Sequence, residues 1–138
     1  RDAQVRFLRG VILSELNRGG EAITVFQKLT EDYPELPEPY NNLAVLYAQQ
    51  RQYDKARNAL EMAIRTHPSY ATAHENLGDI YARLASQAIE GGSSDPFYRH
   101  KLASARFYAD HILPRSAGLV VTVQADNSTL LGLEDEAF

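Results

Sequence analysis

The chain has 138 residues, a net charge of −4 and no cysteine. This length suits one ordinary domain, and the hydrophobic (44%) and charged (23%) fractions are typical of a soluble globular protein. The lack of cysteine excludes disulfides, zinc ribbons and a thiol nucleophile, and the acidic balance disfavours a general nucleic-acid binder. No apolar stretch approaches the roughly 18–20 residues that span a bilayer, so we expect no membrane partner.

The chain begins Arg1-Asp2-Ala3, without an initiator methionine or a signal-like apolar segment. We therefore expect the numbering to start inside a longer gene product. The sequence does not specify a compartment.

A 34-residue period runs through the first part of the chain. Pro34 and Pro68 are separated by it, and the same shift places Gly10 on Ala44 and Ala44 on Gly78. Other positions that match at this shift are Ala22 with Ala56, Phe26 with Leu60, Leu29 with Ala63, Leu43 with Leu77 and Tyr47 with Tyr81. A period of this length indicates stacked pairs of helices, in which small residues stand where helices approach closely.

The pattern predicts helices near residues 2–17, 21–32, 38–50, 54–66 and 71–89. Pro34 and Pro68 end the second helix of each pair, because proline cannot donate the interior backbone hydrogen bond. Turns within the pairs are predicted at residues 17–20 and 50–52, and Asp54 and Ser69 are predicted as N-caps.

These residues resemble the tetratricopeptide repeat. The middle copy is the clearest, with Tyr40, Leu43, Ala44, Tyr47, Ala56, Leu60, Ala63 and Pro68. The first copy departs from the pattern at Arg6 and Arg9, which suits a first helix without a preceding repeat. The third keeps His74, Leu77, Gly78 and Tyr81 and then fails at Glu90.

The resemblance covers residues 3–85 and implies an all-α fold of helical hairpins stacked in a right-handed superhelix. C-terminal helices are expected to complete or cap this stack. Residues 34–44 further resemble bacterial members, which leaves the bacterial cytoplasm and periplasm open as the location.

A different pattern follows residues 91–95, which are predicted to be a linker. Asp95-Pro96 predicts the start of a helix, and an apolar stripe at helical spacing follows it. The stripe consists of Tyr98, Leu102, Ala105, Ala109 and Ile112. A second segment runs from residue 116 to about 131. Its residues 119–123 are compatible with a strand or a helix, and we favour a helix because no partner strand is visible.

This last part resembles the C-terminal end of acyl-CoA dehydrogenases over residues 86–138. The sequence segments that carry the resemblance are residues 95–98, 101–108, 112–114 and 136–138. The flavin-binding bundle, the middle β-domain and the catalytic carboxylate of that family have no counterpart here. We therefore predict tetratricopeptide repeats over residues 1–90 (two full and one half), a linker at 91–95 and a helical segment at 96–138, joined as a natural or engineered chimera.

No residue pattern predicts catalysis, a cofactor or a metal. The histidines His67, His74, His100 and His111 form no ligand pair four residues apart. Adjacent carboxylates such as Glu31 and Asp32 do not face each other on a helix, and no glycine-rich phosphate loop is present. We therefore expect a chain without enzymatic activity.

The family resemblance places function on the concave face, which is lined by the first helix of each repeat. The predicted groove residues are Phe7, Val11, Asn41, Asn42, Val45, Thr72, Glu75 and Asp79. Further groove-facing positions are Gln4, Ser14, Glu38, Ala48 and Ala82. Of the positions at which some family members clamp acidic tails, only Asn42 matches, so an apolar or mildly basic helix or peptide is the expected ligand. Asn41 and Asn42 have an alternative interpretation as residues that satisfy neighbouring backbone.

The predicted function is a non-catalytic scaffold for protein–protein interaction. The alternative is a structural or engineered fusion that has no native partner and associates with itself through its tail. Because the third repeat lacks a second helix, residues 96–113 are expected to replace that helix and residues 115–131 to cap the stack. The competing arrangement packs the tail on another chain and gives a homodimer.

Overall fold

The computed structural model describes residues 2–91, and these form five α-helices. They are α1 (Asp2–Glu15), α2 (Gly19–Asp32), α3 (Pro37–Gln49), α4 (Tyr53–Thr66) and α5 (Ala71–Glu90). Each predicted helix over this range is present, with its ends within two residues of the expected ones. The helices predicted at 96–113 and 115–131, and the stretch 119–123, lie outside the described residues.

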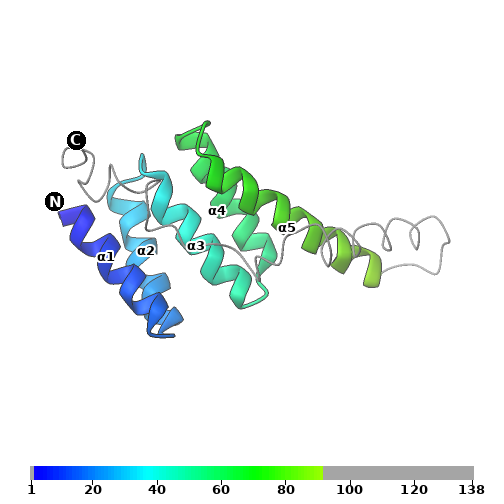
Figure 1. Cartoon of the computed structure of the whole chain (residues 1–138), viewed down its shortest axis with the longest axis horizontal. Coiled ribbons are helices and arrows are strands. Elements are labelled where there is room, and N and C mark those ends of the chain that lie inside the picture. The colour runs from blue at the N-terminus through cyan, green and yellow to red at the C-terminus, as the bar shows by residue number, and fades with distance from the viewer. Residues whose placement is uncertain (1, 92–138) are drawn as a thin grey trace, which may run out of the picture.

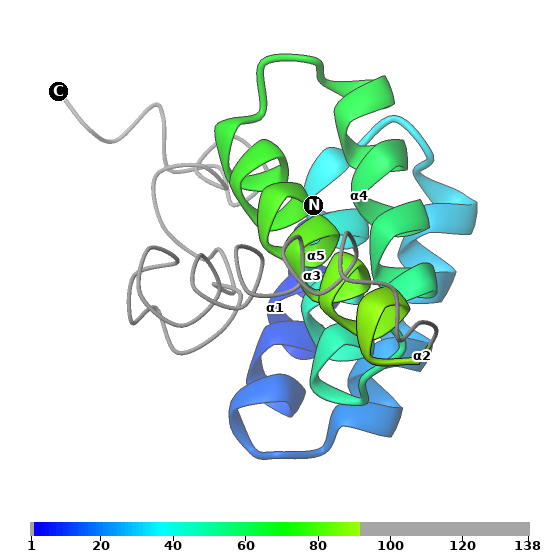
Figure 2. The same cartoon turned by 90° about the vertical axis from the view of Figure 1, so that its right-hand side faces the viewer.

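The helices stack side by side, with α1 and α5 at opposite ends (Figure 1). Each packs on its neighbour in the chain, α1 on α2, α2 on α3, α3 on α4 and α4 on α5. The first helices α1, α3 and α5 form one layer, and α2 and α4 form the other (Figure 2). The described part of the chain is therefore an all-α stack of helical hairpins, as the period of the sequence predicts.

Close packing within the first hairpin depends on Gly10. A Cβ atom at this position would lie 2.6 Å from Cζ of Phe26, so only glycine fits against that ring. The Phe26 ring in turn meets Phe7 edge-on, with 5.6 Å between ring centroids. The matching residue of the second repeat, Ala44, is fully buried. In the third repeat, Gly78 has open space around it, because no described helix follows α5 to pack there.

The turns inside the hairpins recur once per repeat. Asn17 and Arg51, which occupy equivalent positions of the first and second repeats, both adopt a φ of 60°. The equivalent position of the third repeat is Ala85, which lies inside α5. Alanine is a strong helix former and disfavours the left-handed conformation. As a result α5 continues past the position at which the first two repeats turn and reaches 20 residues, whereas the other helices have 13 or 14.

The predicted N-caps are wrong. Gln52 and Tyr70 occupy these positions, and neither makes a side-chain capping bond. Asp54 lies within the first turn of α4 instead, with its carboxylate 3.5 Å from the Arg57 guanidinium. An acid in the first turn favours the helix through the dipole, which explains why the residue type is compatible with a helix start without being its cap.

Equivalent hydrogen bonds connect one repeat to the next. Nε2 of Gln27 donates to the Tyr47 hydroxyl at 2.9 Å, and the Tyr81 hydroxyl donates to Oε1 of Glu61 at 3.1 Å. Glu61 and Tyr81 occupy the same repeat positions as Gln27 and Tyr47, one repeat later. These bonds join the second helix of one hairpin to the first helix of the next and fix their relative register.

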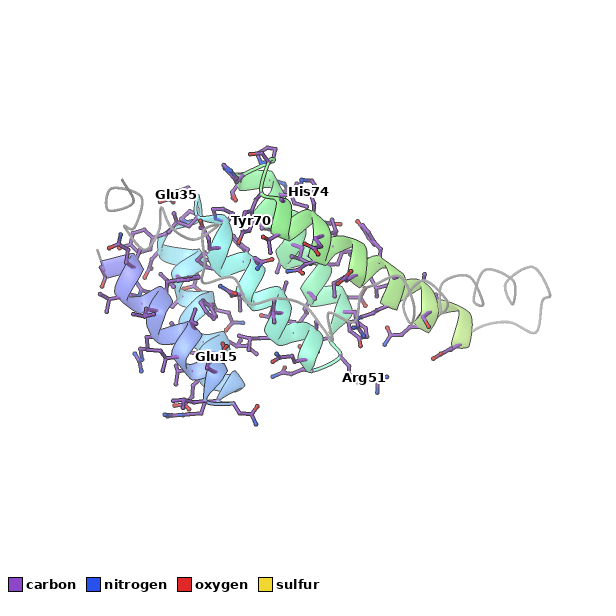
Figure 3. The ribbon with its side chains drawn as sticks, viewed as in Figure 1. Glu15, Glu35, Arg51, Tyr70 and His74 are labelled. Atoms are coloured by element: carbon purple, nitrogen blue, oxygen red, sulfur yellow. The ribbon has the colours of Figure 1, made fainter. Side chains whose placement is uncertain are left out.

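The two edges of the stack hold different chain connections. Glu35, Tyr70 and His74 lie along the edge where the chain passes from one hairpin to the next (Figure 3). Glu15 and Arg51 lie along the opposite edge, where the two helices of a hairpin are joined.

Candidate binding surface

The predicted groove residues lie on three neighbouring helices of one layer. Phe7 and Val11 are on α1, Asn41, Asn42 and Val45 are on α3, and Thr72, Glu75 and Asp79 are on α5. We call the surface formed by these helices the first-helix face. Of the eight side chains, seven are buried and only Glu75 is exposed.

The apolar members of the set differ in their surroundings. Phe7 and Val11 belong to the hydrophobic core cluster, in which Phe7 packs against Phe26. Their side chains therefore contribute to the packing of α1 on α2. Val45 is also buried, on α3.

Asn41 links α3 to α5. Its Oδ1 accepts a hydrogen bond of 2.9 Å from Nδ2 of Asn76, and both side chains are buried. Asn41 therefore satisfies another side chain across the layer, a role that sequence reasoning did not assign to it. A signal was available, because Asn41 and Asn76 occupy neighbouring positions of successive repeats.

Asn42 has a different environment. Only 1% of the residue is exposed, yet neither its amide nitrogen nor its carbonyl oxygen has a hydrogen-bond partner. The repeat explains this, because Asn42 is the equivalent of Asn76 one repeat earlier, and Phe7 is likewise the equivalent of Asn41. The position that offers an oxygen to Asn76 thus holds a phenyl ring in the preceding repeat. The alternative in which Asn42 satisfies neighbouring backbone is not what the structure shows.

Glu38 adds a carboxylate to the first-helix face. It is 6% exposed, and its Oε2 has no hydrogen-bond partner. Burial raises the pKa of this carboxyl above its usual value. The sequence placed Glu38 at a groove-facing position, but not among the candidate site residues. A glutamate between two prolines in the first turn is also typical of an exposed residue that favours the helix dipole.

Asp79 is a second buried acid on this face. Burial raises its pKa, and the charge of Glu75 on the preceding turn raises it further, while Arg83 acts in the opposite direction. Glu38 and Asp79 come from α3 and α5, which are neighbours in the layer. The first-helix face therefore combines apolar and amide groups with carboxylates that lose solvation on burial.

Arg6 shows how the first repeat departs from the others. At the matching position, Tyr40 donates its hydroxyl to a backbone carbonyl at 3.4 Å, and Nε2 of His74 lies 2.7 Å from another. Both carbonyls belong to the proline that ends the preceding repeat. Arg6 instead lies 2.9 Å from the Asp32 carboxylate and over the Tyr33 ring. The Arg6 charge is thus paired within the first hairpin.

Comparison with known families agrees with this architecture. Two tetratricopeptide repeat models match residues 4–35 and 41–88. The chain therefore belongs to the tetratricopeptide repeat proteins, a class of helical-repeat scaffolds that bind other proteins. A third model, described as acetyl-CoA dehydrogenase C-terminal like, matches residues 70–134. It overlaps the repeats along α5 and is not a catalytic domain.

A similar protein is the tetratricopeptide repeat domain-containing protein PYG7, chloroplastic, of Arabidopsis thaliana. It is 40% identical over 69 residues, which cover 46% of this chain and 23% of the relative. The chain thus spans about a quarter of the length of that relative. The bacterial origin and the chimeric join remain predictions.

The described helices carry neither a membrane span nor a metal cluster. Between residues 2 and 91, no helix combines the length and apolarity needed to cross a membrane. The same range brings together no group of three side chains that could hold a metal ion.

Proposed function

We propose that this chain is a non-catalytic scaffold that binds a helix or an extended peptide on its first-helix face. The observation that carries the proposal is the pair Glu38 and Asn42 on α3. Both are buried and both have polar side-chain atoms without a partner. Such groups cost stability in the free protein, and a ligand that supplied their missing hydrogen bonds would offset that cost.

The charges define the ligand that fits. Glu38, Glu75 and Asp79 make the face acidic, and burial raises the pKa of Glu38 and of Asp79, which disfavours their charged forms. A lysine or arginine side chain placed against them would stabilise those charges. Ala48 on α3 and Ala82 on α5, which are half-buried, offer apolar contacts beside these acids. The proposed ligand is therefore an apolar peptide or helix that carries at least one basic residue.

The remaining predictions about partners rest on the sequence alone. The expected exclusion of nucleic acid rests on the net charge of −4. The predicted homodimer through the C-terminal helices concerns residues outside the described range. The alternative of a fusion without a native partner likewise depends on the join, which is predicted near residues 84–86.

Selection from a displayed library of random peptides tests the proposal. We expect the full chain to enrich peptides that combine apolar residues with lysine or arginine, and the affinity to fall as salt is added. Glu38→Gln and Asp79→Asn together should weaken the selected peptide about tenfold or more, as expected for loss of buried charged contacts.

A matched control is Glu31→Gln, because Glu31 is an exposed acid on α2 in the other layer. This variant should bind the selected peptide as the unchanged chain does. Equal affinity of the Glu38/Asp79 variant and the unchanged chain would contradict binding on the first-helix face.

A further inference from the structure

A cavity of about 310 Å³ lies between α2 and α4, the helices of the second layer, with α3 contributing to its lining. Its residues come from one side of each helix, because they recur at about one helical turn. They are Gln27 and Thr30 of α2, Tyr40, Leu43 and Tyr47 of α3, and Lys55, Asn58, Ala59 and Met62 of α4. We call this site the second-helix cavity. It shares no residue with the candidate groove on the first-helix face.

The lining carries one formal charge, that of Lys55. In the part of the chain that the structure describes, Lys55 forms no ion pair. The residues three and four positions away along the chain are Arg51, Gln52, Asn58 and Ala59. None of them is acidic, so α4 offers this ammonium group no partner. The adjacent acid, Asp54, lies 3.5 Å from Arg57 instead.

Tyr47 adds a second available donor. The Lys55 ammonium nitrogen lies 5.6 Å from the centroid of the Tyr47 ring, a cation–π contact that holds it beside this wall. The Tyr47 hydroxyl accepts a hydrogen bond from Gln27, and its own proton has no acceptor among residues 2–91. In the next repeat the tyrosine proton is used, because Tyr81 donates to Glu61. Gln27 stands where that repeat has an acid, so the Tyr47 proton stays free.

The rest of the lining is apolar or uncharged. Leu43 and Ala59 are buried and Met62 is half-buried, so they provide an apolar floor. In the first repeat the equivalent of Lys55 is Glu21, which is paired with Arg18. The second-helix cavity therefore combines an apolar floor with two unused donors, and no acid in its lining compensates for the cation.

We propose that the second-helix cavity binds a glutamate side chain of a partner peptide. The carboxylate accepts hydrogen bonds from the ammonium group of Lys55 and the hydroxyl of Tyr47, while its methylene groups lie against Leu43 and Met62. A cavity of this size is at the lower end of the roughly 300–1,000 Å³ of ligand sites, which suits one side chain and its neighbours. The first-helix face is acidic, so the same glutamate is not expected to bind there.

The chain contains a single methionine, Met62, which makes the cavity directly observable. In the full chain labelled with carbon-13 in the methionine methyl group, this cavity gives one NMR resonance. The probe is the blocked tripeptide leucyl-glutamyl-leucine amide. We expect it to shift the Met62 resonance with a dissociation constant of about 1 mM. The tripeptide with glutamine in place of glutamate should bind at least about fivefold more weakly, because it loses the charge-assisted bonds.

Two variants and a control assign the contact. Lys55→Gln should weaken the glutamate tripeptide about fivefold or more, and Tyr47→Phe about threefold or more, because each removes one donor. Arg65→Gln removes an exposed cation of α4 outside the cavity lining and should leave the affinity unchanged. An unshifted resonance at about 10 mM tripeptide would overturn the proposal. Equal binding of the glutamine tripeptide, or an equal loss with Arg65→Gln, would do the same.

Spectra recorded without the tripeptide test the other possible occupants. A Met62 resonance that moves with protein concentration would assign the cavity to a second copy of the chain. A resonance that moves when Glu134→Gln and Glu136→Gln are introduced would assign it to the acidic C-terminal segment of the chain itself. Either result would overturn binding of a partner peptide, for which we expect the resonance to stay in place in both experiments.

Discussion

Asn76 donates a hydrogen bond to Asn41 across the first-helix layer, at 2.9 Å, whereas Asn42 at the preceding equivalent position has no partner. Asn42 and Asn76 occupy the same place in successive repeats and are both buried. They differ in the residue type at the position of the preceding first helix that bonds Asn76, which is Asn41 in the second repeat and Phe7 in the first. The same residue therefore has opposite energetic consequences at the two positions.

Replacement of Asn42 by leucine should stabilise the fold. The change removes two buried polar atoms without partners, and we expect the free energy of unfolding to rise by about 1–2 kcal/mol. Urea denaturation followed by circular dichroism measures it. The same replacement at Asn76 should lower the free energy of unfolding by about 1–3 kcal/mol, because the buried hydrogen bond from Asn76 to Asn41 is lost. Equal signs for the two variants would contradict this account.

The glycines at matching repeat positions should respond in opposite ways to alanine. Gly10→Ala forces a methyl group against Phe26 and should destabilise the fold by about 1–3 kcal/mol. Gly78→Ala has open space and should stabilise it by about 0.5–1 kcal/mol through helix propensity. Thermal unfolding of the two variants in parallel provides the comparison. Destabilisation by Gly78→Ala would instead indicate that another segment packs against α5 at this point.

Glu38 should make stability depend on pH. Burial raises the pKa of its carboxyl in the folded state, so the folded state holds the proton more tightly than the unfolded state does. Its contribution is therefore most favourable below the unfolded pKa and is lost as pH rises through the folded pKa. Glu38→Gln should raise the free energy of unfolding at neutral pH by about 1 kcal/mol, since no buried charge remains.

Denaturation curves recorded at several pH values distinguish the effect of a buried charge from a stabilisation that does not depend on pH. The advantage of Glu38→Gln should shrink as the pH is lowered toward the ordinary range of a glutamate. Glu31→Gln, at an exposed position, provides the comparison. An advantage of Glu38→Gln that did not change with pH would count against a buried charge as the cause.

The ion pair of Arg6 with Asp32 should have the opposite dependence on pH. The hydrogen bond from Arg6 lowers the pKa of the Asp32 carboxyl. This contribution is present above the unfolded pKa and is lost as pH falls through the lowered folded pKa. Asp32→Asn should therefore lower the melting temperature at neutral pH and have little effect in acid. Added salt should reduce the difference, and insensitivity to salt would indicate a cause other than the ion pair.

Much of the hairpin architecture was predictable because its determinants are local. The repeat period, Pro34 and Pro68 locate the described helices to within two residues. The N-caps were not predictable in the same way. Asp54 is a favourable residue throughout the first turn of a helix, so its presence does not specify which backbone position begins it.

The candidate surface was predicted less completely. The pattern places Phe7, Asn42 and Glu38 on the same layer, because the period assigns each to a first helix. Their environments depend on residues in other helices, and neither the core packing of Phe7 nor the missing partner of Asn42 follows from its own helix.

The sequence by itself determined which residues form helices and how the hairpins repeat, because backbone propensity and apolar spacing act within a few turns. Tertiary structure alone decided which apolar faces are covered. Leu46 is buried because α2 lies before α3, while Ile12, at the matching position of the first described helix, is half exposed. Burial is a property of the neighbouring helix as much as of the residue, and a neighbour is set by long-range packing.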